Sequence, residues 1–269
     1  MKFDFHTHHE RCGHARGNIR DYIETAIKHG LDMIGISDHS PYFSYSEDKA
    51  FPGIAMAKSQ FPEYVDEVLG LKEEYRGKIE VLLGVESDFF PDNVGVYRRH
   101  FDQYPFDFII GSVHFSEGIS IFKKGRWDNL SNKQKIQAKE TYYNLIQESA
   151  HSGMFQILGH IDAMKGFYPA FSLIQTEAVE QTLRVIAECD IAIEINTSGK
   201  TKESGGWYPS DEILERALYY GVKVTFGSDA HDPERVGDDF EVVRNRLREI
   251  GFSEWAFFRQ KQRFLVPLK

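Results

Sequence analysis

Short apolar runs recur along the chain, separated by longer stretches in which apolar residues return every three or four positions. The runs that we expect to form strands are residues 2–5, 33–37, 79–85, 107–113, 156–159, 191–195 and 222–226. Strands that alternate with helical sequence in this way are typical of βαβ units and of a parallel sheet or barrel. The pattern therefore predicts an α/β fold with seven strands.

The helical stretches are marked by their periodicity and by residues that begin or end helices. After the first strand, Gly30 ends a stretch whose apolar residues share one helical face, namely Ile19, Tyr22, Ile23, Ala26 and Ile27. Ser210 is placed to begin a helix that Gly221 ends. A last amphipathic stretch runs from Phe240 to Ile250. Because no linker, repeat or low-complexity segment interrupts the pattern, we expect one domain over residues 1–269.

One irregular stretch, residues 40–61, departs from this alternation and carries the aromatic residues Tyr42, Phe43, Tyr45 and Phe51. Two interpretations are equally open. The stretch is a lid over a cleft, or it is an ordinary packed surface loop.

Composition is consistent with a globular barrel protein. The 269 residues suit a single α/β barrel, and hydrophobic residues make up 41% of the chain, enough for a sizeable core. The formal net charge is -9 and no long basic run offsets it, so we expect no nucleic-acid partner. An acidic surface still allows a phosphorylated substrate, because bound cations reverse the local field.

The first residues, Met1 to His6, lack the apolar segment of a signal peptide, and no apolar run approaches the ~18 residues that a membrane span requires. The two cysteines, Cys12 and Cys189, are too few for a disulfide framework. We therefore expect a cytoplasmic protein without a membrane partner. Cys12 lies in a histidine-rich loop, where it is either a metal ligand or, the favoured interpretation, a small loop residue.

The positions of the histidines carry the strongest functional signal. Of the eleven, six lie at or just beyond the C-terminal end of a predicted strand: His6, His8, His39, His114, His160 and His231. His9 and His14 lie in the loop after the first strand. His29, His100 and His151 fall on predicted helices, and we expect these three and His9 to be structural or exposed. In α/β barrels the C-terminal ends of the strands form the active site.

Spacing strengthens this signal. His6 and His8 are two residues apart on a strand, so their side chains leave the same face and can hold one ion. Asp229 and His231 repeat this spacing, and Glu86 ends the third strand. Each residue alone has an ordinary structural explanation. Because six of the seven strands deliver an imidazole or carboxylate to one rim, the set predicts a cleft that holds two or three divalent ions of Zn, Fe or Mn.

These residues resemble the polymerase and histidinol phosphatase (PHP) family of metallophosphoesterases. The matching motifs are His6-Thr7-His8, Cys12-Gly13-His14, Ser37-Asp38-His39, Gly84-Val85-Glu86, Gly111-Ser112-Val113-His114, Gly159-His160-Ile161-Asp162 and Gly227-Ser228-Asp229-Ala230-His231. They follow the family's order over nearly the whole chain. The resemblance implies a distorted (β/α)7 barrel. Glu194-Ile195-Asn196 and Tyr208-Pro209-Ser210 are similar to the stand-alone histidinol-phosphatase branch of the family.

The resemblance also implies how the site is divided. The first ion would be held by His6, His8, Glu86 and Asp229, the second by Glu86, His114 and His160, and the third by His14, His39 and His231. Catalytic roles would fall to Glu86, Asp229 and Asp38, with Asp38 or a metal-bound water protonating the leaving group. Lys165, Lys200 and Arg235 follow strands, so each either reaches the phosphate or is a solvated loop cation, two interpretations that are equally open. The resemblance favours Lys165 and Lys200, and Asn196 is a further candidate for contact with substrate.

The function implied is hydrolysis of L-histidinol phosphate in histidine biosynthesis by a metal-activated hydroxide. The alternative within the family is a phosphoesterase for a nucleotide or another small phosphate monoester. A metal-free regulatory domain is disfavoured, because buried charges without a ligand are costly. The amine and imidazole of histidinol phosphate would be recognised by a carboxylate or amide from Asp88, Asp162 or Asn196, and by an aromatic wall from Tyr42, Phe43, Phe167 or Tyr168.

Overall fold

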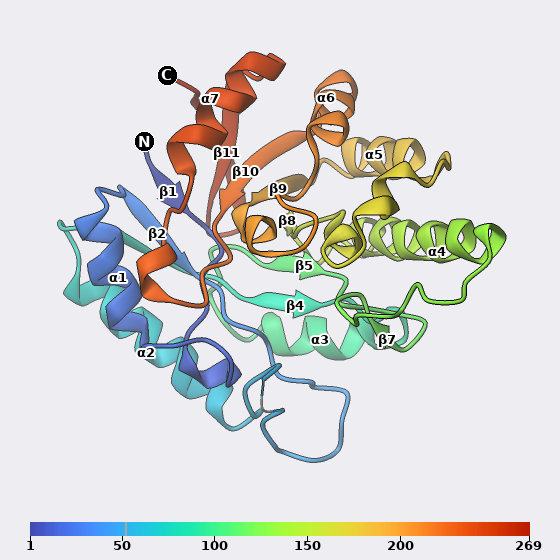
Figure 1. Ribbon diagram of the computed structural model, residues 1–269. Helices are drawn as coiled ribbons and strands as arrows, with labels where there is room; N and C mark the ends of the chain where they lie inside the picture. The colour runs from blue at the N-terminus through green and yellow to red at the C-terminus, as the bar shows by residue number, and fades with distance from the viewer. Residues whose placement is uncertain (52) are drawn as a thin grey trace.

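The computed structural model describes residues 1–51 and 53–269 (Figure 1). Its centre is a wall of parallel strands. Among the described residues this wall has seven positions around the barrel, one of which is occupied by two short strands in succession. In chain order the strands of the wall are β1 (Phe3–Asp4), β2 (Met33–Ile36), β3 (Glu80–Leu83) with β4 (Glu86–Asp88), β5 (Ile110–Ser112), β8 (Ile157–Leu158), β9 (Ala192–Asn196) and β10 (Lys223–Gly227). The third position is shared by β3 and β4, which are separated by Gly84 and Val85. All seven predicted strands are thus confirmed, most of them shorter than predicted.

Two parallel sheets make up this wall, in the orders β1-β2-β3 and β10-β9-β8-β5-β4. They are joined at both borders. The chain beyond β1 pairs with the chain beyond β10 at Thr7 and Ala230, and the chain beyond β2 pairs with β4 at His39 and Glu86. The backbone N–H of His8 donates to the carbonyl of Ala230 at 2.9 Å. The two sheets therefore close into a barrel.

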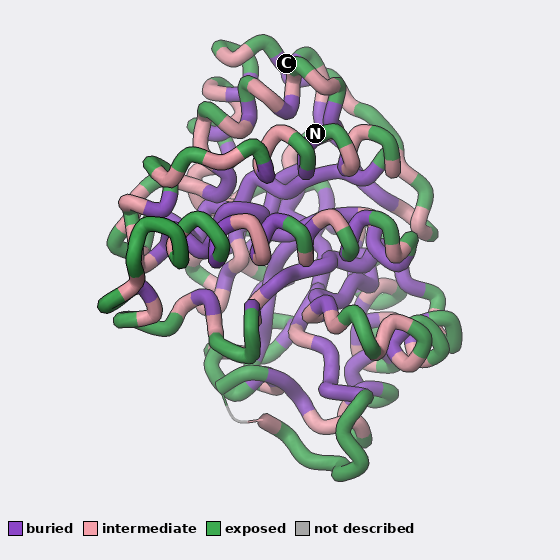
Figure 2. Tube along the Cα trace, turned by 90° about the vertical axis from the view of Figure 1, so that its right-hand side faces the viewer, coloured by how far each residue is buried: buried purple, intermediate pink, exposed green. Residues whose placement is uncertain are grey.

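An α-helix follows each of the seven strand positions: α1 (Ile19–Lys28), α2 (Gln60–Glu74), α3 (Val94–Phe101), α4 (Asn132–His151), α5 (Ala178–Glu188), α6 (Asp211–Tyr220) and α7 (Phe240–Ile250). Figures 1 and 2 show them around the outside of the buried strands. This is the distorted (β/α)7 barrel that the sequence predicted, and it matches the α/β fold class.

Local sequence accounts for the helix boundaries. The side chain of Asn18 accepts from the backbone N–H of Asp21, and the carboxylate of Asp21 accepts from the N–H of Asn18, so a capping box starts α1. Ser210 is the N-cap of α6, and Gly221 ends that helix in the left-handed region at φ +73°. Both ends of α6 were predicted from these two residues.

Glycines on the strands let aromatic rings fill the barrel. A Cβ added to Gly35 or Gly84 would lie 2.5 or 2.2 Å from the ring of Phe108, so only glycine leaves room for that ring. Phe108 also packs edge-on against Phe5, with ring centroids 4.8 Å apart. The interior is therefore a packed core rather than a channel.

The C-terminal hairpin of β11 (Glu254–Arg259) and β12 (Gln262–Pro267) was not predicted. Trp255 of this hairpin lies 4.9 Å from Phe3, and Phe258 lies 6.2 Å from Phe5, measured between ring centroids. The hairpin therefore covers the first strand of the barrel.

The remaining elements are short. They are the hairpin β6 (Phe115–Ser116) and β7 (Ile119–Ser120), and the 3-10 helices η1 (Glu10–Cys12), η2 (Pro91–Asn93), η3 (Ala163–Lys165), η4 (Pro169–Leu173), η5 (Thr197–Thr201) and η6 (Pro233–Arg235). In the described part of the chain, we find no helix whose length and apolarity would let it cross a membrane.

In the stretch 40–61, the described residues 40–51 and 53–59 are irregular up to the start of α2, as predicted. It is packed at its beginning, where Tyr42 and Phe43 are buried, and it reaches a large cavity farther along, where Gly53 and Ile54 form part of the wall. The beginning of the stretch is thus a packed loop, and the interpretation of the later part as a lid stays a prediction.

Candidate active site

The predicted ligands meet at the C-terminal ends of the strands. His6 and His8 follow β1, His39 follows β2, Glu86 begins β4, and the others follow β5, β8 and β10 in turn: His114, His160, Asp229 and His231. The C-terminal ends of the parallel strands all lie at one rim of the barrel, so residues far apart in the sequence become neighbours there. His14 joins them from the loop after β1.

Glu86 lies at the centre of the group, with 1% of its side chain exposed. Its Oε2 atom is 2.9 Å from His39 Nδ1, 3.4 Å from His6 Nε2 and 3.6 Å from His8 Nε2. One carboxylate oxygen therefore faces three imidazoles.

The other oxygen of Glu86 faces a different pair. Oε1 is 3.1 Å from His160 Nε2 and 3.5 Å from His114 Nε2, and these two nitrogens are 3.2 Å apart. Ser112 also donates its hydroxyl to Oε1 at 2.6 Å. Glu86 thus stands between two sets of nitrogens, which is the position of a bridging carboxylate.

Asp229 faces two of the same imidazoles and is the next candidate ligand. Its Oδ1 atom is 3.1 Å from His8 Nε2 and 3.8 Å from His6 Nε2. Asp229 and His160 both have positive φ angles, +52° and +27°. This backbone region is uncommon outside glycine, although Asp and His enter it more often than most residues. Such local strain is typical of functional sites.

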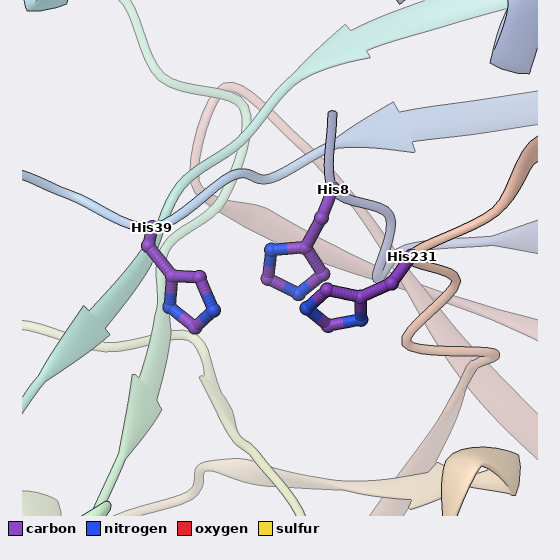
Figure 3. Close-up of side chains that lie close together, drawn as sticks. All are labelled: His8, His39 and His231. Carbon is purple, nitrogen blue, oxygen red and sulfur yellow. The ribbon is translucent and has the colours of Figure 1, made fainter. Parts of the chain in front are cut away.

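A third group of imidazoles lies nearer the surface. His14 Nε2 and His231 Nε2 are 2.8 Å apart. Ring nitrogens of His8, His39 and His231 lie within 4.8 Å of one another, and Figure 3 shows these three rings close together. Cys12 is within the same limit of His14 and His231, but its thiol donates to the carbonyl of His9 at 3.1 Å.

The charges of the site are strongly coupled. Burial would raise the pKa of Glu86, but the imidazoles of His6, His39 and His114 hold it well below its ordinary value. Burial would lower the pKa of His8, but the carboxylates of Asp229 and Asp38 raise it to about 9. The buried carboxylates thus remain ionised and draw positive charge into the site.

The donor set fits a divalent metal ion. His6 Nε2, His8 Nε2 and Glu86 Oε2 are fully buried, and within residues 1–51 and 53–269 they find no hydrogen-bond partner. Leaving buried polar atoms unpaired is costly, whereas an ion between them would satisfy all three. Imidazole and carboxylate ligands suit Zn²⁺ and similar transition-metal ions.

Asp38 is placed behind this group rather than in the open cleft. It is fully buried, with Oδ1 3.2 Å from His8 Nδ1 and Oδ2 3.3 Å from His9 Nε2. Its backbone neighbour His39 also donates an N–H to Oδ1. This position fits a residue that orients His8 and does not fit the predicted protonation of a leaving group.

A cavity of about 650 Å³ opens above the cluster and is lined by His14, His39, Glu86, His114, His160, Asp229 and His231. Its wall also carries three cations, Arg16, Lys202 and Arg235, and the aromatic rings of Phe122 and Phe167. Of the four predicted substrate contacts, Arg235 is the one that reaches the cavity within the described residues.

The other predicted substrate contacts are engaged elsewhere. Lys165 donates to Asp162 at 2.7 Å and to a backbone carbonyl, and it lines a different cavity. Lys200 is paired with Asp238 at 2.7 Å.

Asn196 is fully buried, and its amide donates to Glu194 at 3.0 Å and to Asp229 at 3.2 Å. In this structure Lys165, Lys200 and Asn196 are thus engaged with neighbouring carboxylates, and their contact with substrate stays a prediction.

Four residues of the site were not predicted: Arg16, Lys202 and Phe122 in the cavity wall and Glu194 beneath it. Lys202 follows Lys200 by two residues, so sequence position alone does not distinguish the lysine that lines the cavity from the one that does not. Asp88 and Phe167 were named as groups for the substrate's far end, and both line the cavity.

Four histidines were expected to be structural or exposed, and none of them is among the described residues that line the cavity. His29 Nδ1 is 2.8 Å from the carbonyl of Val236, and the ring of His100 stacks on Phe43 at 4.0 Å. His151 ends α4 on the surface. His9 is buried beside Asp38, one layer below the cluster.

The barrel and its rim of buried imidazoles and carboxylates place this protein among the metal-dependent hydrolases built on a β/α barrel. The family model described as "PHP domain" matches residues 4–198. The chain therefore belongs to the PHP domain family, as its motifs indicated.

Curated relatives cover almost the whole chain. The histidinol-phosphatase of Bacillus subtilis is 31% identical over 91% of this chain and 99% of its own length. A protein of Deinococcus radiodurans named "Probable histidinol-phosphatase" is 30% identical over 96% of this chain and 97% of its own.

Among solved structures, the chain resembles the histidinol phosphate phosphatase of Lactococcus lactis with a TM-score of 0.80. The two are 24% identical, and the match covers 98% of each chain. That structure is a complex with zinc, L-histidinol and phosphate.

Proposed function

We propose that this protein hydrolyses L-histidinol phosphate to L-histidinol and phosphate, the reaction of histidine biosynthesis that its relatives are named for. The observation that carries the proposal is Glu86, whose two oxygens face two separate sets of imidazoles at the floor of one cavity. Two adjacent sets of ligands suit the two-metal sites that phosphatases use.

The ligands would divide into three sets. His6, His8, Glu86 and Asp229 would hold one ion, Glu86, His114 and His160 a second, and His14, His39 and His231 a third. We propose two or three divalent ions per chain, with zinc as the first choice because imidazoles dominate the set. When bound at such ligands, divalent ions neutralise phosphate charge and lower the pKa of water.

The protein's own residues would then position the ester. Arg235 and Lys202 line the cavity and would attract the phosphate dianion. Arg235 is also held by Asp238 at 3.1 Å, whereas the ammonium of Lys202 lies 5.7 Å from the ring centroids of both Phe122 and Phe167. Lys202 is therefore the cation with the greater freedom to meet a substrate.

The far end of the substrate carries an imidazole and a cationic amine. Phe122 and Phe167 form an aromatic wall, with ring centroids 6.4 Å apart, on which an imidazole can pack. Asp88 lines the same cavity and offers negative charge to the amine. These groups would supply the specificity that the metal ligands alone cannot.

A panel of phosphate esters tests the proposal. We expect kcat/KM for L-histidinol phosphate to exceed that for p-nitrophenyl phosphate by at least ~100-fold, because a substrate without the amine leaves polar groups unpaired. The chain should also restore growth without histidine to a strain that lacks this phosphatase. A nucleotide that outperforms histidinol phosphate, without rescue of that strain, would transfer the assignment to the alternative within the family.

A matched pair of lysines tests the cavity wall. Lys202→Ala should lower kcat/KM about 10-fold through loss of a charge-assisted contact with phosphate. Lys200→Ala should leave kcat/KM near wild type, because Lys200 is paired with Asp238 and Asp239. Steady-state kinetics on both variants make the comparison. An equal loss in the two variants would contradict the assignment of Lys202.

We also propose that residues 1–269 act as one domain. The family match ends at residue 198, but β10 closes the barrel against β1, and Asp229 and His231 lie beyond that limit. The set of ligands spans both parts of the chain, which supports a single unit.

A further inference from the structure

Glu194 is a buried carboxylate to which the sequence assigned no function. It lies on β9, and 1% of its side chain is exposed. Oε1 is 2.6 Å from His6 Nδ1. Oε2 accepts from the backbone N–H of His160 at 3.1 Å and from the amide of Asn196 at 3.0 Å. Donors from the ends of three strands thus meet on one side chain.

The contact with Glu194 decides which nitrogen of His6 faces the cluster. A carboxylate bound to Nδ1 requires the proton there, which leaves the lone pair on Nε2. In the part of the chain that the structure describes, Nε2 has no hydrogen-bond partner; it lies 3.4 Å from Glu86 Oε2 and 3.8 Å from Asp229 Oδ1. A carboxylate behind a ligating histidine fixes its tautomer and makes it a stronger ligand.

The neighbouring strands leave space for this carboxylate. A Cβ on Gly227 of β10 would lie 2.0 Å from Glu194 Oε1 and 2.6 Å from His6 Cβ. A Cβ on Gly159, beside β8, would lie 3.6 Å from Oε2 and 2.5 Å from the hydroxyl of Ser112. Any larger residue at position 227 would therefore displace Glu194 or His6.

The same arrangement occurs at two other histidines. Asp38 Oδ1 is 3.2 Å from His8 Nδ1, and Asp88 Oδ1 is 2.9 Å from His114 Nδ1. In both, as in His6, the Nε2 atom faces Glu86. Glu194 therefore takes the same place relative to His6 as these carboxylates take relative to their own histidines.

We propose that Glu194 is a positioning residue for the metal site: it holds His6 directly, and it holds Asp229 through Asn196, whose amide donates to both carboxylates. The inference rests on the metal site of the proposed function, but it does not depend on the substrate.

Glu194→Gln tests this inference, because glutamine keeps the shape and supplies one acceptor oxygen for three N–H donors. We expect the affinity for Zn²⁺, measured by competition with a chelator, to fall about 10- to 100-fold, the range for partners of metal ligands. In the zinc-loaded variant kcat should fall while KM changes little.

Asp107→Asn is the matched control. Asp107 is also a buried carboxylate with three N–H donors, from Lys72, Leu83 and Gln260, but these lie away from the metal site. This variant should lose thermal stability yet keep the zinc affinity of the wild type. Equal zinc affinity in Glu194→Gln and wild type would overturn the proposal.

A measurement on the wild type covers the case in which Glu194→Gln does not fold. In ¹⁵N-labelled protein loaded with Zn²⁺, NMR should show that Nδ1 of His6 carries the proton and Nε2 does not. Protonation at Nε2 would overturn the proposal. The zinc affinity and the NMR measurement do not use the ester. A protein that binds zinc but does not hydrolyse histidinol phosphate would therefore refute the proposed function and leave this inference standing.

Discussion

Removal of divalent ions by a strong chelator is expected to lower kcat by at least about 1,000-fold, and added Zn²⁺ should restore it. Lewis-acid stabilisation is worth several kcal/mol, and about 4 kcal/mol corresponds to this factor. Elemental analysis should find more than one ion per chain before chelation. Mn²⁺ and Fe²⁺, added in parallel, would identify the ion that supports the highest turnover.

Circular dichroism of the chelated protein provides the control, because activity lost through unfolding carries no information about the reaction. Full turnover in a folded protein that retains less than one ion per chain would refute the metal mechanism. It would also remove the basis for the assigned ligands.

Glu86→Gln is expected to lower kcat by about 100- to 1,000-fold and to reduce the metal content. The two oxygens of Glu86 face the two sets of imidazoles that it would bridge, at 3.4 Å for His6 and 3.1 Å for His160. An amide replaces one oxygen by a donor and removes the charge, so one set loses its oxygen ligand and the other keeps only a neutral, weaker one. Loss of a ligand or of its supporting partner typically costs at least ~100-fold.

Glu80→Gln is the matched control for this variant. Glu80 lies on β3, below Glu86 at the same strand position, but it is paired with Arg259 on the outside of the barrel. This variant should keep both its metal content and its turnover. If Glu86→Gln also kept them, Glu86 would not be a metal ligand.

The fold was predictable because its signals are local. Strand and helix alternate along the whole chain, and residues such as Ser210 and Gly221 mark helix ends by their own conformational preferences. The hairpin of β11 and β12 escaped prediction because it follows the last strand–helix unit and pairs outside the barrel wall. Its apolar residues gave no sign of where they would pack.

The ligand cluster was predictable for a different reason. Residues at the C-terminal ends of parallel strands share one rim, so sequence position alone brings Glu86, His160 and Asp229 together. The cations could not be assigned in this way. Lys165 and Lys202 both follow strands, but the nearby Asp162 pairs with the first, while the second faces the cavity. Such pairing depends on side-chain geometry.

The role of Glu194 could not be predicted either, because it also depends on side-chain contacts. Its charge on a buried strand was visible in the sequence, but the donors that meet it come from residues 6 and 160 as well as from Asn196. From sequence alone, a buried carboxylate is equally consistent with a metal ligand, a structural hydrogen-bond acceptor or a residue that positions another side chain. Only the contact with His6 separates these functions.

The border between the first and last strands has a consequence for how this protein is made. His6 and Ser228 touch across it, although 222 residues separate them in the chain. Because synthesis runs from the N-terminal side, the nascent chain displays the imidazoles of His6 and His8 long before their carboxylate partner Asp229 is made. Contacts this distant in sequence form late in folding. The four ligands that we propose for the first ion can therefore come together only after Asp229 has been made.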